Sequence, residues 1–176
     1  IMAVSELIDM SSRGKASMDR IGKLLDETSN VVDRPEVTPM ETVRGDITFK
    51  NLTFRYPGGE FDALRDISFT IKAGQSVGIV GKTGSGKTTL VDLILRTYNV
   101  PDGTLFVDGQ DVNDISIRSL RAGCAYVPQD NFLFSDTIEN NIAFGVEQSD
   151  TETVEAAAKL SDVHSNISEF QHGYGT

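Results

Sequence analysis

The sequence has few cysteines, few histidines and no long apolar run, and each shortage narrows the classes of protein to consider. The one cysteine, Cys124, cannot form an internal disulfide, which fits a reducing compartment and predicts a small buried hydrophobic residue. No apolar stretch approaches the roughly 18 to 20 residues that a membrane-spanning helix needs. His164 and His172 lack the spacing of metal ligands, so we expect them to be surface or packing residues.

Basic residues are outnumbered, with 16 Lys and Arg against 26 Asp and Glu, and the net charge is −10. This balance argues against a surface that binds nucleic acid. The 176 residues, of which 39% are hydrophobic and 24% charged, predict a globular chain long enough for one domain with its own core. The start has no pattern of a signal peptide. Since residue 1 is Ile rather than Met, we expect the chain to be part of a longer protein.

A glycine-rich loop between a predicted strand and a predicted helix is the most informative stretch. The β-branched run from Ser76 to Val80 predicts a buried strand, GKTGSGKTT follows it, and an apolar helical pattern continues to Tyr98. Glycines without a Cβ let backbone N–H groups surround phosphate oxygens, and the helix adds its positive N-terminal end. In this arrangement Lys87 supplies a charge for the phosphates, and the Thr88 hydroxyl supplies a ligand for Mg²⁺. The sequence therefore predicts a triphosphate site.

Upstream of the loop, the chain begins with a predicted helix and a predicted linker. Residues 28–44 contain two prolines and no clear period, which is typical of a linker. The helix over residues 1–27 packs its apolar stripe on the rest of the chain or, as we favour, continues from an upstream domain. The stripe has a seven-residue spacing and includes Val4, Leu7, Met18, Ile21 and Leu25.

From Gly45 onward, alternating apolar and polar residues predict a small antiparallel sheet. Residues 47–54 and 67–71 alternate as strands, with a slip at Asn51 that indicates a bulge or a one-residue break. Residues 104–107 predict a further strand, and the Asp108-Gly109 pair after it predicts a hairpin.

The second half of the chain predicts short helices and one more buried strand. Helices are expected over residues 116–122 and near 137–141, and an apolar strand over 124–127. The spacing of Ser149 and Glu152 is that of a capping box, which predicts the start of another helix. The expected inner face of that helix consists of Val154, Ala157, Ala158 and Leu160.

Three residues outside the loop are candidates for a role in the site. Asp108 ends an apolar run as a Mg²⁺-binding acid would, but the glycine after it and the lack of a second acid indicate a hairpin. Tyr56 lies at a strand end, where its ring either stacks on an adenine or is an ordinary aromatic at a turn. Gln129 follows a predicted strand, where its amide either serves Mg²⁺ or a water or lies in solvent. The lack of an Asn-Lys-x-Asp stretch for guanine favours ATP.

Taken together, these stretches resemble the nucleotide-binding domain of an ABC transporter, of the exporter type that carries its own membrane domain. The resemblance implies an α/β fold over residues 45–176, a P-loop NTPase core with an antiparallel β-subdomain and the start of a helical subdomain. It makes residues 1–27 the helical end of the preceding membrane domain and 28–44 the linker. The segments that carry the resemblance are 16–27, 47–57, 81–89, 103–112, 126–145 and 172–176.

For the binding site, the resemblance implies a role for each matching residue. Tyr56 is the A-loop aromatic that stacks on adenine, Lys87 binds phosphate and Thr88 binds Mg²⁺. Gln129 contacts Mg²⁺ or the attacking water, so Lys87 and Gln129 take the catalytic roles, and residues 130–145 lie against the coupling helices of the membrane domain. The implied nucleotide-binding residues are Tyr56, Gly81, Lys82, Thr83, Gly84, Ser85, Gly86, Lys87, Thr88, Thr89 and Gln129.

The resemblance also implies ATP and Mg²⁺ as cofactors, with a transmembrane domain of the same chain and a second nucleotide-binding domain as partners. It places the protein at the cytoplasmic face of the cell membrane. The sequence departs from the family because the LSGGQ signature, the Walker B strand with its catalytic Glu, and the switch His are absent. We therefore expect ATPase activity of the full-length transporter, and only weak Mg-ATP binding, without turnover, by a marginal or self-associating 176-residue chain. The alternatives are a soluble P-loop enzyme such as a small-molecule kinase, and an ATP switch without a transport role.

Overall fold

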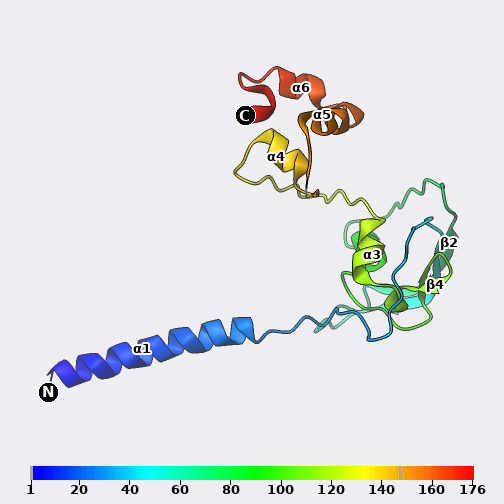
Figure 1. Cartoon of the computed structure of the whole chain (residues 1–176). Helices are drawn as coiled ribbons and strands as arrows, with labels where there is room; N and C mark the ends of the chain where they lie inside the picture. Colours follow the sequence, from blue (N-terminus) through cyan, green and yellow to red (C-terminus); the bar gives the residue numbers. More distant parts are fainter. Residues whose placement is uncertain (1, 147) are drawn as a thin grey trace. The chain divides into compact units, whose positions relative to one another are not determined.

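The computed structural model describes residues 2–146 and 148–176, with side chains from residue 10 onward. The chain forms two compact units, of which the first ends at Ala125 and the second runs from Tyr126 to Thr176. Figure 1 follows the elements along the chain, from the long N-terminal helix through the sheet to the short C-terminal helices. The glycine-rich loop belongs to the first unit.

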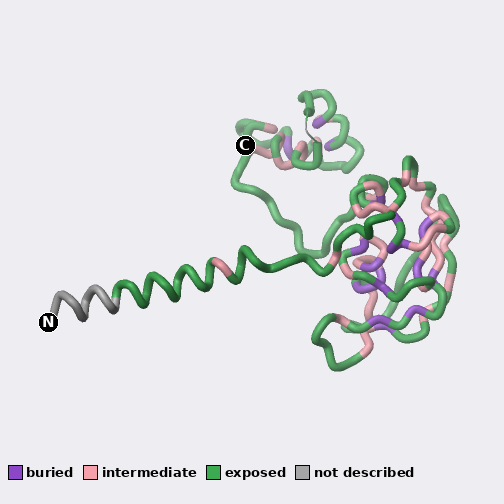
Figure 2. The backbone as a smooth tube through the Cα atoms, turned by 60° about the horizontal axis from the view of Figure 1, so that its bottom comes forward, coloured by how far each residue is buried: buried purple, intermediate pink, exposed green. Residues whose placement is uncertain are grey.

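The N-terminal helix α1 spans Met2–Leu25, which confirms the helix predicted there. Its described apolar stripe is exposed, with Met18 at 70%, Ile21 at 54% and Leu25 at 78% of their full accessible surface. Figure 2 shows this helix in green along almost all of its described length. The stripe is thus not covered by the rest of the chain, and two of its expected members, Val4 and Leu7, lie outside the described side chains. Over the described residues, no helix is both long enough and apolar enough to span a bilayer.

The sheet of the first unit has four strands in the order β2-β1-β3-β4. Strand β1 spans Ile47–Phe54 and β2 spans Leu64–Ile71, while the short strands β3 and β4 span Leu105–Val107 and Gln110–Asp111. All neighbouring pairs are antiparallel, as predicted. The β3-β4 hairpin turns at Asp108-Gly109, where φ is 50° and 85°, the left-handed pair that a two-residue hairpin of this twist requires.

The expected slip in β1 is a bulge at Asn51. The register against β2 shifts between Phe49 and Leu52, and Asn51 has a left-handed φ of 47°. The Ser68 hydroxyl accepts the Asn51 N–H at 2.7 Å, so the backbone donor that leaves the ladder keeps a partner. The bulge restores the inward direction after Phe49, so that Leu52 and Phe54 are also buried.

One apolar cluster joins the sheet to two helices of the first unit. Helix α2 spans Lys87–Ile94 and buries Leu90 and Leu93, and helix α3 spans Ile117–Ala122 and buries Leu120. Fully burying each such side chain contributes about 1.5–3 kcal/mol. Figure 2 colours the buried stretches of the chain purple. The other buried members are Phe49, Leu52, Phe54, Leu64, Val100, Leu105, Val107, Val112 and Ile115.

The sequence predicts strands over residues 76–80 and 124–127, and both predictions are wrong. Neither segment pairs with another strand in the described part of the chain, and Val80 and Val127 are 96% and 85% exposed. An apolar run adopts a buried strand only when other strands and helices cover it, and these segments have no such neighbours. Cys124 is consequently half-buried rather than fully buried, although burial still raises the pKa of its thiol.

The second unit consists of short helices around a small apolar centre. Helix α4 spans Ile138–Ala143, α5 spans Thr151–Leu160 and α6 spans His164–Ser168, and a 3₁₀ turn, η2, spans Gly173–Gly175. The buried side chains are Val154, Ala158 and Ile167.

Helix α5 is present as predicted, but its start and its buried face differ from the prediction. Its N-cap is Asp150 rather than Ser149, and the Asp150 carboxylate accepts the Thr153 N–H at 2.8 Å. Only two of the four expected inner residues are buried, because Ala157 and Leu160 are exposed. Among the described residues of the second unit, no element covers these two positions.

The two histidines have the surface and packing roles that the sequence predicts. His164 is half-buried, and its Nδ1 lies 2.7 Å from the Tyr174 hydroxyl in a hydrogen bond. His172 is exposed.

Candidate phosphate-binding site

The glycine-rich loop, residues 81–86, connects an exposed segment to the first turn of α2. Gly84 and Gly86 have φ values of 78° and 88°, a backbone region that residues with a Cβ rarely adopt. A Cβ on Gly86 would lie 2.6 Å from Leu64 Cδ2 and 2.7 Å from the Ala63 carbonyl oxygen, and one on Gly81 would lie 2.5 Å from Ser85 Oγ. The loop therefore needs glycine at Gly86, where a backbone carbonyl stands in the way, whereas the Ser85 hydroxyl can rotate away from a Cβ on Gly81.

Lys87 is the first residue of α2, and its side chain turns back over the loop. Its Nζ donates to the carbonyl oxygens of Gly81 and Lys82, each at 2.8 Å. The ammonium group is thereby held at the loop, beside the positive end of the helix macrodipole. The first turn of α2 has no acidic residue that would reduce this positive potential. Anions are favoured at such a position.

Tyr56, which the sequence proposes as a residue of the site, lies beside the start of α2. Its hydroxyl is within 2.7 Å of Thr89 Oγ1, and its ring meets Phe54 and Tyr98 edge-on, with centroids 5.1 Å away in both cases. These contacts fix the ring, which is half-buried, next to the loop. Its adenine-stacking role stays a prediction.

The loop and Tyr56 border a shallow hollow of about 260 Å³. This volume is below the roughly 300–1,000 Å³ of a complete small-molecule site, so the hollow alone does not enclose a whole ligand. A larger hollow of about 600 Å³ lies between residues 39–43 and α3, away from the glycine loop. Backbone geometry and charge, rather than volume, therefore identify the candidate site. The lining residues are Tyr56, Ala63, Gly84, Ser85, Gly86, Lys87, Thr88 and Thr89.

The other residues predicted for the site are distributed over both units. Lys82, Thr83 and Thr88 are exposed at the loop, while Thr89 is buried. Gln129 belongs to the second unit, where it is exposed in a stretch without helix or strand. Its approach to Mg²⁺ or to a water stays a prediction.

Asp108 has a structural role, in agreement with its assignment to a hairpin. Its carboxylate accepts the backbone N–H groups of Arg44, Gly45 and Asp46 at 2.6, 3.1 and 2.9 Å. Burial disfavours the charged carboxylate, but these backbone hydrogen bonds outweigh burial and lower its pKa. Asp108 thus secures the chain that enters β1.

Sequence reasoning missed Arg96, which is 1% exposed and lies just after α2. Its guanidinium donates to Asp33 Oδ1, the Val32 carbonyl and the Ile115 carbonyl, at 3.1, 3.0 and 2.8 Å. The signal was an arginine in the apolar pattern that the sequence predicts to continue to Tyr98, because a charge buried with apolar residues requires compensation.

Comparison with known proteins identifies the class. Residues 64–174, well over half of the chain, match the family described as ABC transporter. The glycine loop at the start of α2, with Lys87 over it, lies within this match. The chain belongs to the ABC transporter family, with the ATP-binding fold of that family.

Several curated relatives are ABC exporters or ATP-binding proteins. The chain is 41% identical over 170 residues to the uncharacterized ABC transporter ATP-binding protein YfiB of Bacillus subtilis, covering 97% of this chain and 29% of YfiB. It is 40% identical to YheI of the same organism, a probable multidrug resistance ABC transporter ATP-binding/permease protein, covering 93% of this chain and 28% of YheI. It is also 42% identical to ATP-binding cassette sub-family B member 6 of Xenopus tropicalis, covering 90% of this chain and 19% of that protein.

A solved structure shares the fold. It is a bacterial Atm1-family ABC exporter with ATP bound, which matches with a TM-score of 0.83 and 36% identity over 94% of this chain. The match covers 29% of the exporter chain. The chain thus spans less than a third of the length of these relatives.

Proposed function

We propose that this chain is the front part of the ATP-binding domain of an ABC exporter, which couples Mg-ATP binding and hydrolysis to transport across a membrane. The observation that carries the proposal is the glycine loop, whose close backbone approaches and bound Lys87 ammonium form an anion-binding start of α2. The printed names of relatives such as YheI, an ATP-binding/permease protein, support the exporter assignment.

Within this site, each residue acts on a different part of ATP. Lys87 neutralises charge on the phosphates, and the N–H groups of the loop donate to their oxygens. The ring of Tyr56, fixed by Thr89 and Tyr98, presents a flat surface for adenine. Gln129, which is exposed in the second unit, is the residue we assign to orient water or Mg²⁺.

The residues present fit Mg²⁺ that arrives with ATP rather than a metal held by the protein alone. In the described part of the chain, no group of three or more His, Cys, Asp or Glu side chains is placed to hold a metal ion. Mg²⁺ commonly takes one or two protein ligands, with phosphate oxygens and waters completing its shell, and Thr88 is exposed at the loop to serve as one. When bound, the ion neutralises charge that develops on the transferred phosphate.

The partner surface proposed for the transmembrane domain is an exposed aromatic cluster in the second unit. Phe134 stacks on Phe144 with ring centroids 4.3 Å apart, and Phe132 meets Phe134 edge-on at 5.0 Å. Phe132 and Phe144 are 76% and 69% exposed, so the cluster is available to a partner. The membrane domain of the same chain would cover it at the cytoplasmic face, and a second nucleotide-binding domain would close over the ATP.

The 176 residues alone are proposed to bind Mg-ATP weakly and not to hydrolyse it. No catalytic glutamate follows a buried strand in this sequence, and the segment 76–80 leading into the loop is exposed. A loop without a supporting strand is poorly preorganised, which weakens binding. Steady ATP hydrolysis by the purified 176-residue chain that Lys87→Ala abolishes would contradict this part of the proposal.

The function is tested by ATP hydrolysis of the full-length protein in lipid nanodiscs. Lys87→Ala removes the phosphate-neutralising charge, so we expect the hydrolysis rate to fall by about 100-fold or more. Lys50→Ala removes an exposed lysine of β1 outside the site and should leave the rate unchanged. Equal rates for Lys87→Ala and the unmutated protein would contradict the assignment of the loop.

A further inference from the structure

The chain segment at residues 30–38, which we call the strap, is docked on the first unit although it forms no helix and takes part only in an isolated bridge. The Thr38 N–H donates to the Asp114 carbonyl at 3.0 Å, and the Ser116 N–H donates to the Thr38 carbonyl at 3.3 Å. Arg34 forms ion pairs with Asp102 and Asp114. The strap is therefore part of the first unit rather than a free linker.

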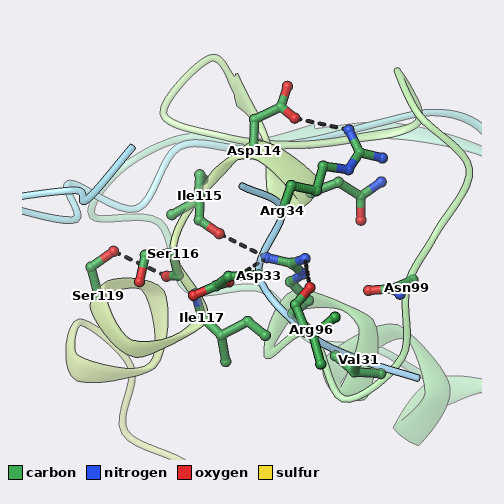
Figure 3. Close-up of polar contacts among 12 residues, drawn as sticks. Val31, Asp33, Arg34, Arg96, Asn99, Asp114, Ile115, Ser116, Ile117 and Ser119 are labelled. Atoms are coloured by element: carbon green, nitrogen blue, oxygen red, sulfur yellow. Dashed lines mark hydrogen bonds and ion pairs between the residues drawn. The ribbon is translucent and has the colours of Figure 1, made fainter. Parts of the chain in front are cut away.

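Arg96 is the buried centre of this docking. Two of its three acceptors, Asp33 Oδ1 and the Val32 carbonyl, belong to the strap, and the third is the Ile115 carbonyl. Figure 3 shows the Arg96 guanidinium close to Asp33, with a dashed line to the Ile115 carbonyl. Its Nε has no partner among the described residues. Because the carboxylate that pairs with the guanidinium is Asp33, the buried charge depends on the strap for compensation.

Asp33 joins the strap to a second element. The carboxylate oxygen that accepts from Arg96 also accepts the Ile117 N–H at 2.9 Å, at the first turn of α3. Arg121 of α3 donates in turn to the carbonyls of Leu95 and Arg96 at 3.0 Å each. The C-terminal end of α2, the strap and α3 are thus held in one hydrogen-bonded junction.

Helix α2 connects this junction to the glycine loop. Its first residue is Lys87 and its last is Ile94, two positions before Arg96. A helix of eight residues is not stable in water by itself, so its order depends on what holds its two ends and its apolar face. Contacts at one end increase the population of the ordered helix to which the other end binds.

We propose that docking of the strap and binding of nucleotide at the glycine loop are thermodynamically coupled through α2 and Arg96. Mg-ATP at the loop strengthens the docking of the strap, and by reciprocity the docked strap raises the affinity for Mg-ATP. This inference rests on the proposed function, because it takes the glycine loop as the ATP site. Since only residues 26–29 separate α1 from the strap, displacement of that helix acts on the loop by the same route.

The first experiment measures Mg-ATP affinity in the full-length protein with a fluorescent ATP analogue. Asp33→Ala removes the carboxylate that holds Arg96 and Ile117, so we expect affinity to fall by about fivefold or more. Asp33→Asn keeps an oxygen acceptor and should lose less. Glu36→Ala removes an exposed carboxylate of the same strap that takes no part in the junction, and should not change the affinity.

A second readout keeps the proposal open to contradiction if Asp33→Ala does not fold. In the unmutated protein, saturating Mg-ATP should slow hydrogen exchange at the Thr38 and Ile117 amides by about fivefold, the same factor as the expected change in ATP affinity. Unchanged exchange at both amides, or full ATP affinity in a folded Asp33→Ala protein, would overturn the coupling while leaving the proposed function intact. Failure of the unmutated full-length protein to bind ATP would instead overturn the proposed function and this inference with it.

Discussion

At the scale of residues, the two left-handed glycines of the phosphate loop differ in what surrounds them. Both Gly84 and Gly86 have φ near +80°, but only Gly86 faces neighbours, the side chain of Leu64 and the carbonyl of Ala63. Around Gly84 no atom would lie within 4 Å of an added Cβ. The pair therefore separates backbone strain from steric overlap within one loop.

We predict that Gly86→Ala destabilises the first unit by roughly 2–5 kcal/mol, the sum of left-handed strain and overpacking. Gly84→Ala carries the strain alone and should cost about 1–2 kcal/mol. The measurement is the midpoint of urea unfolding of the full-length protein, followed by a probe in the first unit. Equal losses for the two substitutions would show that Gly86 does not approach β2 as closely as the structure indicates.

At the residue scale, local motifs can be predicted from the sequence, whereas contacts between residues distant in the chain cannot. Lys87, Thr88 and the loop glycines form a local motif, so the sequence alone proposes a role for them, which stays a prediction. The Asp33–Arg96 pair spans 63 positions, and no local pattern indicates which acid compensates a buried arginine. The Tyr56–Thr89 contact was likewise out of reach, because it depends on how β1 and α2 pack.

At the scale of elements, the sequence correctly predicts the turns and bulges that depend only on neighbouring residues. The bulge at Asn51 and the hairpin at Asp108-Gly109 follow from alternation and from residues that tolerate positive φ. The strands expected at 76–80 and 124–127 were wrong, because a strand also requires partners distant in sequence. Composition showed that both segments are apolar, but it did not show whether other strands cover them.

The N-cap of α5 gives a prediction about pH. The hydrogen bonds from Thr153, first through its hydroxyl and then through its N–H, lower the pKa of Asp150. Because the pKa is lower in the folded state, the cap stabilises α5 fully above the ordinary pKa of an aspartate, and this stability is lost as pH falls through the lowered value. Hydrogen exchange at the Val154 amide should therefore accelerate, relative to the intrinsic rate, on acidification below about pH 4.

The control for this prediction is Asp150→Asn, which keeps an oxygen acceptor for the cap but does not ionise over this range. Its exchange at the same amide should be independent of pH once the intrinsic rate is removed. If the substituted and unmutated proteins respond to acid alike, the ionised cap is not the cause.

At the scale of the whole molecule, the described part of the chain combines a candidate phosphate site with several exposed apolar surfaces. The apolar stripe of α1, the segment 76–80 and the aromatic cluster of the second unit are all exposed. The solved exporter that shares this fold is more than three times as long, since the match covers 29% of it. Under the proposed function, these are the surfaces that we expect other parts of an exporter to cover.

The measurement that tests the central claim most directly is equilibrium binding of Mg-ATP by calorimetry to the full-length protein and to its Lys87→Ala and Lys50→Ala variants. Loss of a charge-assisted contact costs about 1.5–3 kcal/mol, so we expect Lys87→Ala to bind about tenfold or more weakly. Lys50→Ala should bind as the unmutated protein does. Equal affinity of the Lys87→Ala and unmutated proteins would contradict the account, because it would mean that ATP does not bind at this loop.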